Sequence, residues 1–234
     1  MLHSPPFYIQ GARSITFLPP PLLHACAETT ILIGGANRGI ERALLEVYLT
    51  KPDHTLPVSE GSSLIIVKID GLVESDALHA VRKLTAEGSG VDHIDIFIAN
   101  DGVATNYPKV SELKASDFIA HFTPNVLGAA ETPICVTIGS DAGNLTPFPN
   151  AAYSPPKIAV HGLLKKVNVE EEGIDAFVVN PCFCQTDMGN TAAKFGGLEK
   201  AFLLVSETCP QIVQLIDTAT KKSHGSRLLN YDGK

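Results

Sequence analysis

Residues 30–45 read TILIGGANRGIERALL, and this stretch decides the fold that the sequence predicts. Its first five residues form an apolar run of strand length, and residues 38–49 have the apolar spacing of a helix. The glycines Gly34, Gly35 and Gly39 stand where the strand turns into the helix. In that place glycines let backbone amides approach a pyrophosphate, and the helix N-terminus adds partial positive charge. Taken alone, such a cluster is equally typical of an ordinary tight turn.

The rest of the chain repeats this alternation of strand-length apolar runs with helix-length amphipathic segments. Such alternation is typical of a parallel sheet with helices on both faces. We therefore predict one α/β domain, a Rossmann-like doubly wound parallel sheet, over residues 29–234, preceded by a loosely attached leader over residues 1–28. The predicted strands are residues 30–34, 63–70, 93–100, 133–140, 174–180 and 227–231. The predicted helices are residues 38–49, 75–86, 112–121, a segment that ends near Glu172, and 199–220 with an interruption near Pro210.

One connection is too short for a complete fold of this kind. Only residues 50–62 separate the first predicted helix from the next predicted strand, and they contain Pro52, Pro57 and Gly61. A dinucleotide-binding fold normally places a whole strand and a helix in this interval. We therefore expect one strand-helix unit to be missing or reduced to a loop.

Charge and cysteine content exclude several classes of function. The chain carries 18 Lys and Arg against 25 Asp and Glu, a formal net charge of −7, and has no basic run, so nucleic acid is not an expected partner. No segment reaches the roughly 20 apolar residues of a membrane span, so no membrane partner is expected.

Five cysteines without a regular frame predict reduced thiols in a cytoplasmic protein. Cys182 and Cys184 lack a second Cys or His pair at zinc spacing, so no metal site is predicted.

Tyr153 and Lys157 are the side chains that most clearly suggest a chemical function. If their segment is helical, they lie one turn apart on the same face. A nearby ammonium favours the phenolate, so Tyr153 could exchange a proton near neutral pH. Such a pair is also typical of an ordinary helix surface. Its neighbours favour a site, because Ser140 and Asn100 end two predicted strands at the carboxyl edge of the sheet, where open α/β folds bind ligands.

The order of these motifs resembles the short-chain dehydrogenase/reductase family. The resemblance extends from about Thr29 to the terminal segment of residues 229–233, and the stretches at 35–40, 67–70 and 185–189 are most similar to fungal ketoreductases of the norsolorinic acid ketoreductase type. The ordered set is far more specific than any single motif. It consists of the glycine-rich turn, Asp70, Asn100-Asp101-Gly102, Asn125, Ser140, Tyr153 with Lys157, and Pro181-Cys182.

The resemblance implies a role for each matching residue. Tyr153 would be the proton donor, Lys157 would lower its pKa and hold the nicotinamide ribose, Ser140 would bind the substrate carbonyl oxygen, and Asn125 would position a water that leads to Lys157. The residues implied in cofactor binding are Gly35, Asn37, Arg38, Gly39 and Ile40 at the phosphates, Asp70 at the adenine, Asn100 at the ribose, Tyr153 and Lys157, and Cys184 and Thr186 at the nicotinamide.

The same resemblance implies the reaction and its cofactor. The expected activity is reduction of a ketone or aldehyde on a small aromatic or polyketide-like substrate, in a protein that forms a dimer or tetramer. NADP is the expected cofactor, with NAD as the alternative, because Arg38 suits a 2′-phosphate and the predicted elements include no strand that would carry an acidic NAD-selecting residue.

Several residues depart from the family pattern and leave an alternative open. Glu41 stands at the third glycine of the turn, Asp101 replaces a small residue, and Cys182 replaces a glycine. Pro155 and Pro156 interrupt the Tyr-Lys segment, which is tolerable only if they fall in the first turn of a helix. With the short connection, these changes also fit a catalytically impaired dinucleotide-binding or dimerising protein.

Overall fold

The fold is known from a computed structural model, which describes residues 14–18, 29–50, 63–67, 74–84, 86, 91, 93–99, 102–126, 134–144 and 150–234. Asp70, Asn100 and Asp101, which the sequence analysis singles out, lie outside the described residues. In the described part of the chain, every helix is too short or too polar for a membrane crossing.

A parallel sheet forms the centre of the molecule. It contains β2 (Ile31–Gly34), β4 (Ile96–Ala99), β5 (Ile134–Ile138), β6 (Asp175–Asn180) and β7 (Leu228–Asn230), each paired in parallel with the next. Nearly every residue of β2, β4, β5 and β6 is buried, as expected for strands covered on both faces. The predicted doubly wound α/β fold is therefore confirmed.

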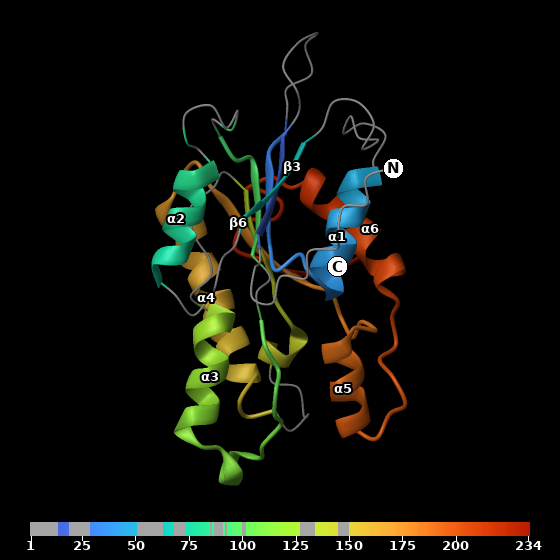
Figure 1. Cartoon of the computed structure of the whole chain (residues 1–234). Helices are drawn as coiled ribbons and strands as arrows, with labels where there is room; N and C mark the ends of the chain where they lie inside the picture. The colour runs from blue at the N-terminus through green and yellow to red at the C-terminus, as the bar shows by residue number, and fades with distance from the viewer. Residues whose placement is uncertain are drawn as a thin grey trace, which may run out of the picture.

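Helices cover both faces of this sheet (Figure 1). On one face lie α1 (Gly39–Thr50) and α6 (Val205–Asp217), and on the other lie α2 (Glu74–Leu84) and α4 (Ser154–Glu170). The buried apolar side chains form two clusters, one on each face of the sheet, because successive side chains of a strand point to opposite faces. In β2, Ile31 and Ile33 pack in the cluster with α1 and α6, whereas Leu32 packs in the cluster with α2 and α4.

Two further helices lie beyond the carboxyl edge of the sheet (Figure 1). They are α3 (Ala115–Val126), which packs on α4, and α5 (Asp187–Phe195), which follows β6. The sequence analysis predicts a loop where α5 forms. The missed signal is Thr186, whose hydroxyl caps the helix by accepting a hydrogen bond from the Gly189 amide at 3.0 Å. The predicted interruption of the last helix is also wrong, because α6 runs through Pro210.

The far edge of the sheet is built in an unexpected way. The strand order is β3-β1-β2-β4-β5-β6-β7, where β1 is Ser14–Leu18 and β3 is Ser63–Val67. β1 pairs antiparallel with β2 on one side and with β3 on the other. It comes from the segment predicted as a leader, of which only these five residues are described, and it lies between β2 and β3.

Candidate active site

A cleft of about 660 Å³ opens at the carboxyl edge of the parallel strands. This volume is within the usual range for small-molecule sites. Its walls come from the glycine-rich turn after β2, the ends of β5 and β6, the start of α4, and α5. The cleft therefore lies where open α/β sheets bind ligands. Most of the described residues that the sequence analysis singles out line it, namely Gly35, Asn37, Arg38, Gly39, Ile40, Ser140, Tyr153, Lys157, Cys184 and Thr186.

The two prolines of the Tyr-Lys segment fall in the first turn of α4. The helix begins at Ser154, directly after Tyr153, and Pro155 and Pro156 occupy positions whose amides have no partner within a helix. Tyr153 already has helical backbone angles, and its carbonyl accepts a hydrogen bond from the Lys157 amide at 3.4 Å. Tyr153 and Lys157 thus keep their one-turn spacing, with Lys157 Nζ 5.5 Å from the centre of the Tyr153 ring.

The Tyr153 phenol is held in its neutral form. Burial is the main cause that raises its pKa to about 12; the hydrogen bond with the Ser140 side chain opposes this shift, and the negative charge of Glu41 adds to it. This differs from the expectation that Lys157 brings the pKa of Tyr153 toward neutrality. The physical reason is that loss of hydration disfavours the phenolate more than its neighbours stabilise it. A neutral phenol is nevertheless the form that can donate a proton.

Lys157 is deeply buried beneath the cleft. Its side chain is 4% exposed, and Nζ donates a hydrogen bond to the Ile138 carbonyl at 3.1 Å, at the end of β5. Burial lowers the pKa of Lys157 to about 8, although the negative charge of Glu41 opposes this shift. The fold therefore holds an ammonium next to Tyr153 at a cost in stability.

We expect Lys157→Met to stabilise the ligand-free protein at pH 7 by about 2 kcal/mol. Between pH 8 and 10.5 the unfolded chain binds a proton at Lys157 that the folded chain lacks, so the stability of the wild type rises with pH through this window. The advantage of the variant is complete below pH 8 and disappears above 10.5. Urea titrations across this range check it, with Lys165→Met on the exposed face of α4 as the control. A constant difference between Lys157→Met and the wild type would contradict it.

Asn125 is a buried residue whose side-chain oxygen, like Lys157 Nζ, lies near Gly102. Its side chain is 4% exposed, and its amide nitrogen donates to the carbonyls of Val103 and His121 at 3.1 and 2.6 Å. Its Oδ1 is buried without a hydrogen-bond partner among the described residues. A Cβ on Gly102 would lie 2.7 Å from this oxygen and 3.7 Å from Lys157 Nζ, so glycine at 102 leaves room beside both groups.

The end of β6 is fixed by one buried side chain. Asn180 donates hydrogen bonds to Asp141 Oδ2 at 2.5 Å and to Asn230 Oδ1 at 2.9 Å, which joins the ends of β5, β6 and β7. Its side-chain oxygen Oδ1 accepts a hydrogen bond from the backbone amide of Cys182 at 3.1 Å. Cys182 has a φ of 60°, a region that glycine adopts more readily, so the substitution of the family glycine is accommodated with strain.

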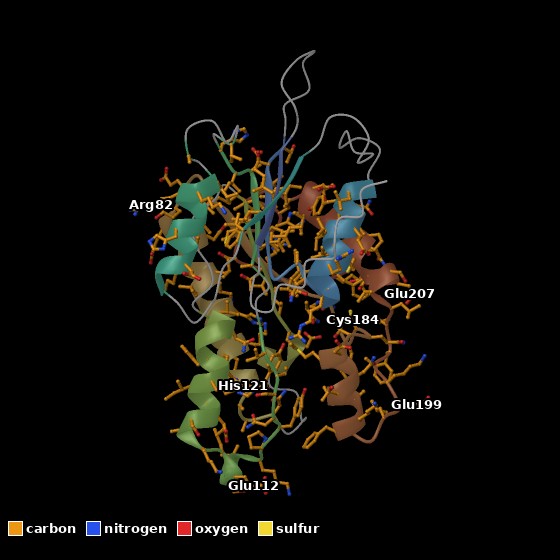
Figure 2. The ribbon with its side chains drawn as sticks, in the orientation of Figure 1. Arg82, Glu112, His121, Cys184, Glu199 and Glu207 are labelled. Atoms are coloured by element: carbon orange, nitrogen blue, oxygen red, sulfur yellow. The ribbon has the colours of Figure 1, made fainter. Side chains whose placement is uncertain are left out.

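The two residues predicted at the nicotinamide are held by contacts within the protein. Figure 2 shows Cys184 in the region between α1 and α5. Its thiol donates to the Pro181 carbonyl at 3.0 Å and lies 3.4 Å from Thr208 Oγ1, so the sulfur is engaged inside the protein. The Thr186 hydroxyl caps α5. A ligand would therefore meet mainly the backbone of Cys184.

An aromatic rim borders the cleft, and the sequence analysis does not predict it. Tyr107 stacks on Phe195 of α5 with ring centres 5.0 Å apart, and Phe183 meets Phe202 edge to face at 5.6 Å. Phe195 and Phe202 are 53% and 68% exposed, which is unusual for such large apolar side chains. Because these residues are far apart in the chain, no local pattern could have brought them together.

The turn after β2 contains two glycines in left-handed backbone conformations. Gly35 and Gly39 have φ values of 80° and 68°, which explains why glycine stands at both positions. Asn37 and Arg38 between them are exposed. The carboxylate of Glu41 also lines the cleft, with Oε2 3.1 Å from the point where a Cβ on Gly39 would lie.

Solved structures with this fold include two carbonyl reductases. Sniffer of D. melanogaster and an NADPH-bound enzyme from chicken fatty liver each superpose with a TM-score of 0.68, at 17% identity, over 86% of this chain and 95% of theirs. At that identity the likeness concerns the fold alone. No family model matches the chain.

Curated relatives are much more similar in sequence. Norsolorinic acid ketoreductase nor1 of Dothistroma septosporum is 32% identical over 88% of this chain and 91% of its own length. The norsolorinic acid ketoreductase of Aspergillus parasiticus is 30% identical over 88% of this chain and 90% of its own. Identity at this level over nearly the whole of both chains shows that the protein belongs to the short-chain dehydrogenase/reductase family, oxidoreductases that act on carbonyl and alcohol groups.

Proposed function

We propose that the protein reduces a ketone or aldehyde with NADPH and that Tyr153 donates the proton. The observation that carries this proposal is the meeting of Tyr153, Ser140 and Lys157 in one cleft. The Tyr153 phenol is hydrogen-bonded with the Ser140 side chain and lies beside the buried ammonium of Lys157. This gives a neutral acid, a second hydroxyl group and a cation around one point.

A dinucleotide fits most of the cleft. The left-handed glycines of the turn allow close approach of phosphates, the N-terminus of α1 favours an anion, and Lys157 lies where it could hold a ribose hydroxyl. Glu41 is the residue that fits least, since its carboxylate lines the same cleft. When bound, the reduced nicotinamide supplies a hydride for the carbonyl carbon.

The chain's own residues supply the rest of the reaction. Ser140 donates a hydrogen bond to the substrate carbonyl oxygen, and Tyr153 transfers its phenolic proton to that oxygen as the alcohol forms. Lys157 stabilises the tyrosinate that remains, since an ammonium beside a phenolate lowers the free energy of the charged form. Asn125, whose Oδ1 lies near Gly102, positions a water that leads to Lys157. Through this water and Lys157 a proton returns to Tyr153.

The substrate in this proposal is a flat aromatic ketone. Tyr107, Phe195, Phe183 and Phe202 offer ring faces and edges at the border of the cleft, and aromatic side chains favour aromatic ligands through offset or edge-to-face packing. The relatives are named ketoreductases, which agrees with a ketone as the substrate.

The experiment is a titration of the purified protein with NADPH and NADH, followed by an aromatic ketone panel in which loss of reduced nicotinamide is recorded. We expect NADPH binding and turnover on at least one ketone. Tight NADPH binding without turnover on any would instead favour the catalytically impaired binding protein.

We expect Arg38→Gln to weaken NADPH binding about tenfold and to change NADH binding less than twofold. Arg38 is exposed at the cleft, and a charge-assisted hydrogen bond to a 2′-phosphate contributes about 1.5–3 kcal/mol. Isothermal titration with both nucleotides checks this. Arg42→Gln is the matched control, because Arg42 lies one turn further along α1 and pairs with Glu46 at 2.6 Å on the surface. Equal losses for NADPH and NADH would argue against 2′-phosphate recognition.

A further inference from the structure

Glu41 points back over the glycine-rich turn instead of away from it. It lies in the first turn of α1, and its Oε2 is 3.1 Å from the position of a Cβ on Gly39, the first residue of that helix. The side chain is half-buried and lines the cleft. The sequence allows two orientations, outward and harmless or inward and costly, and the structure has the inward one.

The charge of Glu41 reaches the catalytic groups. It raises the pKa of Tyr153 and of Lys157, although those residues lie on the opposite wall, at the start of α4. A carboxylate that faced solvent would be screened from both groups. The negative charge is therefore directed into the space between α1 and α4.

This charge lies where a cofactor phosphate would go. The dipole of α1 favours an anion at its N-terminus, and the Glu41 carboxylate belongs to the first turn of this helix. A pyrophosphate approaching Gly35 and Gly39 would meet a second negative group within the same cleft. Two like charges at short range in a partly desolvated site repel each other strongly.

We propose that Glu41 limits the affinity of the protein for its dinucleotide, because its carboxylate holds the anion position at the start of α1 and must be displaced when the pyrophosphate binds. The inference rests on the proposed function, since it takes the ligand of the cleft to be a dinucleotide. In this proposal Glu41 alone weakens cofactor binding, at a turn whose glycines otherwise allow a phosphate to approach closely.

The test compares NADPH dissociation constants of the wild type, Glu41→Gln and Glu41→Ala at low and high salt. Glu41→Gln removes the charge and keeps the size, and we expect it to bind NADPH several-fold more tightly. Glu41→Ala removes both, and we expect about a tenfold gain, equivalent to about 1.4 kcal/mol. The difference between the wild type and Glu41→Gln should shrink as salt rises, which a purely steric role would not cause.

The matched control is Glu46→Gln on the same helix, whose carboxylate pairs with Arg42 on the surface and should leave NADPH affinity unchanged. Thermal melts of each variant establish that the fold is retained. Equal or weaker NADPH binding by both Glu41 variants, with measurable binding by the wild type, would overturn this inference and leave the proposed function intact. Absence of NADPH binding in the wild type and all variants would overturn the proposed function, and the inference with it.

Discussion

Turnover of Tyr153→Phe is expected to be lower than that of the wild type by a factor of about 10³, with NADPH affinity changed less than twofold. A positioned general acid contributes about 10²–10⁴ in rate. Phenylalanine retains the ring beside Lys157 Nζ and removes only the hydroxyl that is hydrogen-bonded with Ser140. Steady-state rates with an aromatic ketone and a separate NADPH titration distinguish loss of chemistry from loss of binding.

The control for Tyr153→Phe removes a phenol elsewhere. Tyr231 follows β7 and packs against the hydrophobic cluster around α1 and α6, outside the cleft, so Tyr231→Phe should keep the wild-type rate. Because the pKa of Tyr153 is about 12 and that of Lys157 about 8, both groups are mainly protonated below pH 7, and the deficit of Tyr153→Phe should be the same at pH 6 and pH 7. Undiminished turnover of the variant would show that another group donates the proton.

A proline in β1 is expected to cause the largest loss of stability. Thr16 pairs with Leu32 of β2 on one side and with Ile65 of β3 on the other, so β1 has a neighbour on both sides. Proline removes an amide donor from the ladder and fixes φ, and within a paired strand or helix this costs about 3 kcal/mol or more. Since domains of this size are stable by only about 5–15 kcal/mol, Thr16→Pro should lower the urea midpoint markedly.

Thr16→Val is the matched variant, because it keeps the backbone amide and a β-branched side chain suited to a strand. We expect its urea midpoint to stay close to that of the wild type. If Thr16→Pro unfolds at the same urea concentration as Thr16→Val, then β1 does not contribute to the stability of the sheet. A loss confined to the proline variant would show that a segment before the first predicted strand completes the sheet.

The geometry of Tyr153 and Lys157 was predictable because it is local. Tyr153 and Lys157 are four residues apart, and a helix that begins at Ser154 is enough to bring them to one face. Likewise, the strand ends that carry Ser140 and Asn180 follow from apolar runs whose direction is set by parallel pairing. Thr186 with Asp187 was a start signal for α5 that the sequence analysis missed among the neighbouring glycines and threonines.

The sequence by itself determined the strand-turn-helix at residues 30–45, the alternating α/β order and the shared edge of the candidate site, because each depends on apolar periodicity and short-range spacing. Only the tertiary structure decided that β1 lies between β2 and β3, that Tyr107 meets Phe195, that Glu41 turns inward, and that the pKa of Tyr153 rises. These features depend on pairing between distant segments and on the loss of water around buried groups. Neither is encoded in the identity of any one residue and its chain neighbours.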